Sequence, residues 1–381
     1  MNACRAILPV LLAGALAATL AAEERITIPA VASILGASPF YSDVRVCNTS
    51  YVSPVDVTAH YRCFLGACPP ASASPLTFTL APRQTRAFDD MIATAFQAPN
   101  SAGGVELVLS GGAVASTLAV TSRLYSTAPR PTVGMFIPGM TGAAAQRRSV
   151  LTQIANGGSG QGFRTNVGAF NATDTPATAT FAVYWQDHWV GEVVRTIAPH
   201  SGVQVNHVFG PNGIDHALLE TSDAVVTVQT DGPPVYAYAA VIDNATTDPI
   251  FVIGVPDVEP LLSVGGVNDT RVSLVPGQNT CGNVTVQDNP TTVAHVPGSH
   301  ALTLTHAGQT YEGTVQDDGT FATQPKNVSA GGASFTITIT GTFDRQGFQA
   351  RVRVDQTTPA PACSYLVDWA GLKQQGANFF P

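Results

Sequence analysis

The sequence predicts an all-β fold, with two tandem immunoglobulin-like β-sandwich repeats followed by a C-terminal antiparallel β-meander or small barrel. One observation predicts the strands, a second excludes a charged helical alternative, and a third predicts how the strands are grouped. Short runs of alternating apolar and polar residues are separated by clusters of Gly, Pro, Asn and Ser. Charged residues make up 12% of the chain against 45% hydrophobic residues, which excludes a charged coiled coil. The region before residue 258 also contains an internal duplication.

The first 22 residues predict a secretory signal peptide. Arg5 precedes the apolar run AILPVLLAGALAATL, and the small residues Ala21 and Ala22 come before a polar stretch. A membrane anchor is the alternative, but it needs about 20 apolar residues. No later segment of the sequence is apolar for that length. We therefore expect removal of residues 1–22 and a chain without a membrane span. It would be secreted, periplasmic or on the cell surface of a bacterium.

Three collinear matches reveal the duplication. The segments FYSDVRVCN (40–48) and FRTNVGAFN (163–171) lie 123 residues apart, and TLAPRQ (79–84) and TIAPHS (196–201) lie 117 residues apart. Matches in the same order predict two copies of one module. The drop in spacing predicts six extra residues in the first copy, in a hairpin loop that contains CFLGACPP. A third match, at a spacing of 118, pairs Pro131 with Pro249 and Pro138 with Pro256.

The two copies are assigned to residues 23–140 and 141–257. Each contains closely spaced short alternating runs, which predict a sandwich of antiparallel strands. The segment from Asp89 to Phe96 is the one predicted helical turn, with Asp89 as its N-cap. We expect the remaining residues of each copy to form strands and connecting turns.

Residues 258–381 form the predicted C-terminal domain. Apolar and polar residues alternate through several runs there, and DDG (317–319) and DRQG (344–347) have the composition of hairpin turns. An antiparallel meander is the predicted arrangement. Closure into a small barrel and packing as a sandwich are both compatible with this pattern.

The cysteines are consistent with an oxidising compartment. Loss of Cys4 with the signal peptide leaves five cysteines, an odd number. Cys47 aligns with Phe170 in the second copy, so we expect it to be the unpaired thiol, buried and unreactive. No metal-ligand spacing occurs among the cysteines. The spacing favours two disulfides, Cys63 with Cys68 inside the extra loop and Cys281 with Cys363 across the C-terminal domain.

Candidate metal ligands are few, and no cofactor is expected. Asp243, Asn244 and Asp248 form the best oxygen-rich cluster. Calcium takes six to eight oxygen ligands, so a role in capping a turn is the favoured alternative. The four histidines of the second copy lack paired ligand spacing and are expected to lie in surface loops. They are His188, His200, His207 and His216.

Two further groups of residues are candidate sites. Trp185 and Trp189 flank a turn and predict either an aromatic platform for a ligand or ordinary cross-strand packing. Asp317 and Asp318 fit a hairpin turn better than a catalytic pair. The sequence has no nucleophile elbow, P-loop, zinc-protease or dinucleotide motif.

The second copy opens with FRTNVGAFN, continues through TIAPHS and ends with VYAYAAVIDNATTDPIFV. In this combination it resembles a repeated module of uncharacterised exported bacterial proteins. The resemblance covers about residues 25–257, although the first copy diverges at its end. It implies tandem β-sandwiches and carries no established activity. The C-terminal region is similar in its alternating residue pattern to small secreted β-barrel domains.

Two classes of function fit these observations. The net charge is −8 and the only lysines are Lys326 and Lys373, so no basic patch predicts nucleic acid as a partner. The first hypothesis is a non-enzymatic exported protein of tandem β modules with a surface display, adhesion or scaffold role. The alternative is a secreted carbohydrate-binding or carbohydrate-active accessory protein, which requires carboxylates and aromatic residues to converge in a cleft. The expected partner is extracellular or on a cell surface, with a glycan as one candidate.

Overall fold

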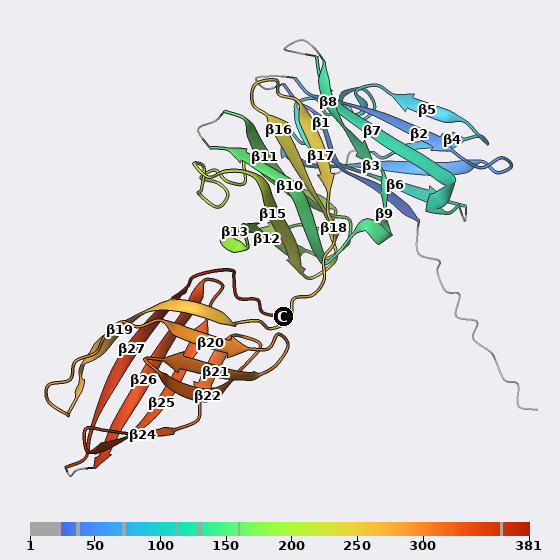
Figure 1. Cartoon of the computed structure of the whole chain (residues 1–381). Coiled ribbons are helices and arrows are strands. Elements are labelled where there is room, and N and C mark those ends of the chain that lie inside the picture. The colour runs from blue at the N-terminus through green and yellow to red at the C-terminus, as the bar shows by residue number, and fades with distance from the viewer. Residues whose placement is uncertain are drawn as a thin grey trace, which may run out of the picture.

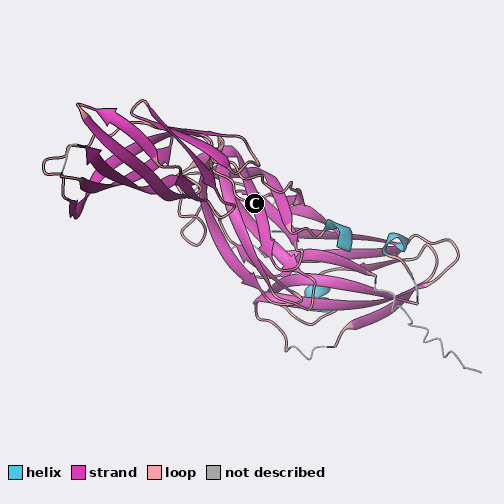
Figure 2. Cartoon of the chain, turned by 90° about the horizontal axis from the view of Figure 1, so that it is seen from below, coloured by secondary structure: helices cyan, strands magenta, loops and turns pink. Residues whose placement is uncertain are grey.

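The computed structural model describes residues 24–35, 39–70, 74–111, 113–127, 132–158, 161–358 and 361–381. The predicted signal peptide lies outside these residues. Nearly all regular structure is β-strand, which confirms the predicted all-β fold (Figure 2). Two sandwiches and a barrel follow one another along an elongated molecule (Figure 1).

The first sandwich has two antiparallel sheets. The five-stranded sheet has the order β4 (Leu76–Leu80), β3 (Val55–Gly66), β6 (Ser101–Ser110), β1 (Arg25–Ser33) and β9 (Met140–Thr141). The four-stranded sheet has the order β5 (Thr85–Phe88), β2 (Tyr41–Asn48), β7 (Leu118–Ser126) and β8 (Val133–Pro138). Inward-facing residues of both sheets, such as Ile28, Val46 and Leu107, are buried in one core. Thr141 therefore belongs to the first sandwich, one residue beyond the predicted boundary.

The second sandwich repeats this strand order. Its five-stranded sheet has the order β13 (His188–Ile197), β12 (Ala177–Trp185), β15 (Glu220–Asp231), β10 (Arg148–Gly157) and β18 (Val255–Pro256). Its four-stranded sheet has the order β14 (Ser201–Val205), β11 (Phe163–Asn171), β16 (Tyr236–Asp243) and β17 (Pro249–Ile253). Each strand therefore occupies the position of the strand nine places earlier, as expected for two copies of one module.

Residues 123 apart make equivalent hydrogen bonds where the chain passes from one sheet to the other. The Ser42 hydroxyl accepts a hydrogen bond from the Ala32 amide at 2.7 Å, and Thr165 accepts one from the Ala155 amide at 3.1 Å. Asn48 and Asn171 are fully buried, and their Nδ2 groups donate to backbone carbonyls in both copies. The matching side chains in the sequence are therefore structural, because they satisfy buried backbone groups.

The proline match at a spacing of 118 is wrong. Pro138 at the end of β8 pairs with Thr121, and Ile253 at the end of β17 pairs with Tyr238. Since Thr121 and Tyr238 are equivalent at a spacing of 117, Pro138 corresponds to Ile253, and the spacing there is 115. Pro256 lies instead in β18, paired with β10. The spacing changes because the chain joining β7 to β8 is longer than the one joining β16 to β17. Pro131 lies outside the described residues.

The sandwich core pairs β2 with β5 and β3 with β6, as strands B with E and C with F pair in immunoglobulin domains. The edges differ, because β1 pairs with β6, whereas strand A of an immunoglobulin domain lies in the sheet of strand B. Strand β7 pairs with β2 instead. The two-layer architecture is therefore present, but the complete immunoglobulin strand order is not.

The C-terminal strands close into an eight-stranded antiparallel barrel, so of the two predicted arrangements the structure has the barrel. Closure comes from pairing of β23 with β25, and β24 (Lys326–Ala330) pairs along another part of β25. Aromatic side chains such as Phe343, Phe348 and Trp369 fill the interior. The barrel strands are β19 (Gly266–Asn279), β20 (Thr291–His295), β21 (Ala301–His306), β22 (Gln309–Val315), β23 (Thr320–Thr323), β25 (Ala333–Phe343), β26 (Gly347–Thr358) and β27 (Cys363–Lys373).

Both predicted hairpin turns of the barrel are present. Oδ1 of Asp318 accepts hydrogen bonds from the amide and hydroxyl of Thr320, between β22 and β23. Oδ1 of Asp344 accepts from the amides of Gln346 and Gly347, between β25 and β26. Carboxylates that bind the backbone two residues ahead stabilise such turns.

The described helices are short. α1 spans Met91–Thr94, and the 3₁₀ turns η1 and η2 span Ala115–Thr117 and Gly142–Ala144. The predicted cap at Asp89 is wrong: Asp90 precedes the helix in a left-handed conformation without a capping hydrogen bond from its side chain. The Asp90 amide donates instead to Oδ1 of Asp43 at 3.0 Å. Among the described residues, no helix is long and apolar enough to cross a membrane.

Candidate functional site

The predicted metal cluster is a turn between β16 and β17. Oδ1 of Asp243 accepts a hydrogen bond from the Ala245 amide at 2.8 Å, and Oδ2 accepts one from the Thr246 hydroxyl at 3.0 Å. These bonds lower the pKa of Asp243. The Asn244 side chain accepts from Arg164, and the Asp248 amide donates to Thr246. The side-chain oxygens of Asp243 and Asn244 are thus engaged in local hydrogen bonds, and the described residues contain no cluster of three or more metal-ligating side chains.

The four histidines of the second copy do not form one site. His207 lies in the segment that follows β14, and its Nε2 is 2.9 Å from Oδ1 of Asn156. His200 instead contacts the first sandwich, where its Nδ1 lies 2.9 Å from Glu106. His188 and His216 are exposed. Each of these histidines therefore has a separate environment, and the expected surface position is wrong for His200, whose side chain is only 19% exposed at the interface between the sandwiches.

The two expected disulfides are present, and Cys47 is free. The bond Cys63–Cys68 joins β3 to the residues that follow it, and Cys281–Cys363 joins the loop after β19 to the start of β27. Cys47 is half-buried on the outer side of β2, so it is less buried than expected.

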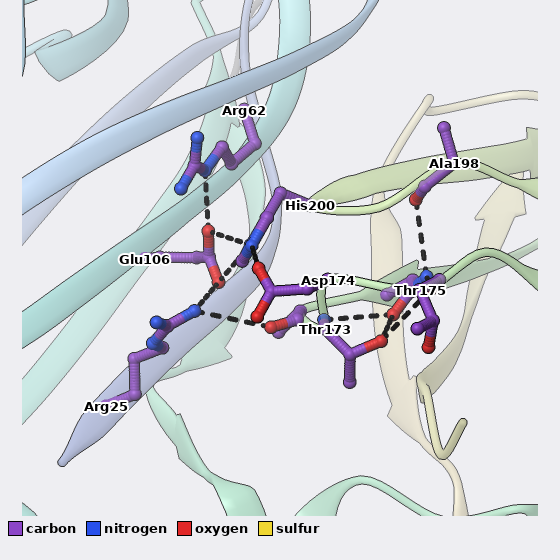
Figure 3. Close-up of polar contacts among 10 residues, drawn as sticks. Arg25, Arg62, Glu106, Thr173, Asp174, Thr175, Ala198 and His200 are labelled. Carbon is purple, nitrogen blue, oxygen red and sulfur yellow. Dashed lines mark hydrogen bonds and ion pairs between the residues drawn. The ribbon is translucent and has the colours of Figure 1, made fainter. Parts of the chain in front are cut away.

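A buried ionic cluster joins the two sandwiches. Glu106 on β6 is 0% exposed and is the one buried acidic residue among those described. Its carboxylate accepts from Arg25 Nη1 at 3.1 Å and from Arg62 Nε at 2.6 Å. His200 approaches it from the second sandwich and reaches Asp174 with its other ring nitrogen at 2.8 Å (Figure 3). This hydrogen bond lowers the pKa of Asp174.

Apolar contacts surround this ionic cluster. Phe64 of the first sandwich and Phe170 of the second lie with ring centroids 6.5 Å apart. The Phe170 ring lies over Gly104 and the Phe64 ring over Gly202, where a Cβ atom would be only 2.5 Å and 2.4 Å from the respective rings. Small residues at these two positions therefore allow the sheets to approach closely. The outer face of the first five-stranded sheet is covered by the second sandwich.

The equivalent face of the second sandwich is not covered by another sandwich and forms one side of a cleft. Thr27 pairs with Glu106 and Val150 pairs with Thr227, so Thr227 occupies the position of the ionic residue Glu106. The cleft has a volume of about 1090 Å³. Strands β10, β12 and β15 form one side of the cleft. The other side consists of the linker at residues 257–263, the barrel turns at Pro297 and Arg345, and residues near the end of the chain. We call it the sandwich–barrel cleft.

Aromatic residues gather in the sandwich–barrel cleft. Tyr184 on β12 stacks on Phe379 near the end of the chain, with ring centroids 5.9 Å apart and planes inclined by 22°. Trp185 and Phe380 also line the cleft. Nε1 of Trp185 donates to Oδ1 of Asp223 at 3.0 Å, which fixes the plane of the indole ring. Burial raises the pKa of Tyr184.

The two arginines at the cleft are already paired. Arg345 donates to Tyr184 Oη at 2.6 Å and lies 3.3 Å from Glu192, so it ties the barrel to the sandwich. Arg148 lies 3.4 Å from Asp257. Nε of Arg148 is buried and has no hydrogen-bond partner among the described residues.

The sequence predicted one of the residues of this cleft and missed others. Trp185 is one of the two tryptophans for which the sequence predicts either a ligand platform or cross-strand packing, and it lines the cleft. Its neighbour Trp189 is not among the cleft residues. Phe379 and Phe380 were missed, because they come from a segment without regular alternation. A backbone bridge between Ser263 and Phe379 brings that segment to the cleft. No family model, curated protein or solved structure matches the chain.

Proposed function

We propose that this protein is an exported, non-enzymatic binding protein that holds an extracellular glycan in the sandwich–barrel cleft, in an adhesive or display role. The observation that carries the proposal is the convergence of Trp185, Tyr184 and Phe379 with carboxylates in one cleft. Sugar rings have apolar faces that stack on aromatic side chains and hydroxyl edges that bind polar groups. The cleft supplies both kinds of surface.

Two further observations support this function. A volume of about 1090 Å³ slightly exceeds the usual range for ligand pockets, roughly 300–1,000 Å³, and has room for several sugar units. The two disulfides fit an oxidising compartment, as the proposed signal peptide and the resemblance to exported tandem sandwiches also do.

The test is glycan-array binding by the full chain, followed by titration of the best ligand. Trp185→Ala removes the stacking surface and is expected to weaken binding about tenfold, since an aromatic contact contributes roughly 1.5 kcal/mol. Trp189→Ala is the matched control, because that residue is in the same hairpin but not in the cleft. Absence of glycan binding, or equal affinity in Trp185→Ala, would reject the proposal.

A scaffold role without a ligand is the second candidate. The ionic cluster around Glu106 supports it, because it fixes the two sandwiches against each other. Under this hypothesis neither tryptophan substitution alters any binding.

A further inference from the structure

The charges around the sandwich–barrel cleft are not balanced. Its two arginines each have an acidic partner, Arg148 with Asp257 and Arg345 with Glu192. Three other carboxylates line or border the same cleft without a cationic partner among the described residues. They are Asp187, Asp223 and Glu259. A cleft with this excess of negative charge attracts a positively charged ligand.

Asp223 lies next to the aromatic surface. Its Oδ1 accepts hydrogen bonds from Trp185 Nε1 and from the Thr221 hydroxyl, each at 3.0 Å. No hydrogen bond or ion pair within the described part of the chain uses its Oδ2. One oxygen therefore orients the indole ring while the other is available beside that ring.

An ammonium group is the ligand that suits both neighbours. The face of a tryptophan ring attracts cations, more strongly than that of tyrosine or phenylalanine. A carboxylate forms charge-assisted hydrogen bonds with the same group. The aromatic ring and the carboxylate act through different interactions, and both attract a cation.

We infer that the sandwich–barrel cleft selects glycans with free amino groups, of the oligoglucosamine class, and that Asp223 is the residue that recognises the ammonium. This inference rests on the proposed glycan-binding function. A glucosamine unit carries its ammonium at the edge of a rigid ring with an apolar face, so this face stacks on Trp185 while the charge approaches Asp223. A lysine side chain brings the same charge on a flexible chain and lacks the rigid ring.

The experiment measures binding of the full chain by calorimetry at about pH 5.5, where sugar amines are protonated. The probes are a glucosamine oligomer, the N-acetylglucosamine oligomer of the same length, and an oligolysine peptide. We expect the glucosamine oligomer to bind at least about tenfold more tightly than its acetylated counterpart, as one ammonium–carboxylate contact provides. High salt should reduce this difference.

Two variants locate the recognition. Asp223→Asn retains an acceptor for Trp185 Nε1 but removes the charge, so it should lower the affinity for the glucosamine oligomer at least about tenfold and abolish the preference for the amine. Unaltered tryptophan fluorescence would show that the ring keeps its position. Glu312→Gln removes an exposed acid on the outer face of β22 and serves as the matched control.

The outcomes separate the inference from the function on which it rests. Equal binding of both oligomers overturns the amine selectivity and leaves glycan binding in place. Binding of neither oligomer overturns both. Binding of oligolysine without glucosamine would assign the cleft to a basic peptide and also overturn the inference. A preference that persists in Asp223→Asn would remove Asp223 from the recognition.

Discussion

Removal of the buried carboxylate at the joint between the sandwiches should destabilise both of them. In Glu106→Ala, Arg25 and Arg62 lose their acceptor at distances of 3.1 Å and 2.6 Å, and His200 loses its contact at 2.9 Å. Glu106 is fully buried, whereas each arginine side chain is 30% exposed. The variant therefore leaves two cationic groups at the interface without their buried counter-charge.

The size of the effect follows from this geometry. Breaking a buried ion pair by removing one partner typically costs about 3 to 5 kcal/mol. Because both arginines retain some access to water, we expect the unfolding free energy to fall by about 3 kcal/mol, the lower end of this range. For two coupled sandwiches this corresponds to a fall in melting temperature of roughly 6 to 12 °C. Asp89→Asn breaks the exposed pair Arg45–Asp89 and should cost less than about 1 kcal/mol.

The assay combines calorimetry with hydrogen exchange. The melting transition of the sandwiches should move while that of the barrel stays in place, and β1, β3, β6 and β14 should exchange faster in Glu106→Ala. Glu106→Gln retains acceptor oxygen and shape, so it should lose less stability. A shift no larger than that of Asp89→Asn, or faster exchange confined to the barrel, would refute this account of the interface.

Three further predictions concern local features. Cys281→Ser removes a disulfide with a sequence separation of 82 and should lower the unfolding free energy of the barrel by about 4.5 kcal/mol on the loop-entropy model. Cys63→Ser removes one with a separation of 5 and should lower that of the first sandwich by about 2 kcal/mol. Parallel urea titrations of both variants measure the two losses. Burial lowers the pKa of His306 from 6.5, so the unfolded chain binds its proton first. The barrel should therefore lose stability as the pH falls below about 6.5, and His306→Gln should weaken this dependence in melting curves at pH 5 to 8. Asn48→Ala and Asn171→Ala each remove several hydrogen bonds to buried backbone and should each cost about 2 to 3 kcal/mol; a large cost in only one copy would contradict their equivalence.

The sequence by itself determined the strand content and the duplication. Alternation of apolar residues is a local consequence of the pleat, so Val44 and Val167 could be assigned to inward-facing strand positions without knowledge of their partners. The disulfide between Cys63 and Cys68 was predictable for a similar reason, since both residues lie in one extended hairpin. The proline match failed because identical residues in a short span do not reveal a change in loop length.

Only the tertiary structure decided how the modules meet. Nothing near Glu106 in the sequence indicates that it is fully buried, because its partner His200 lies in another module. The same holds for the cleft, where Tyr184 and Phe379 come from distant parts of the chain and meet through a stack and a backbone bridge. Barrel closure likewise depends on the pairing of β23 with β25, which the alternation of either strand does not specify. Local patterns record which face of a strand is buried, whereas the partner that buries it is fixed by packing between segments far apart in sequence.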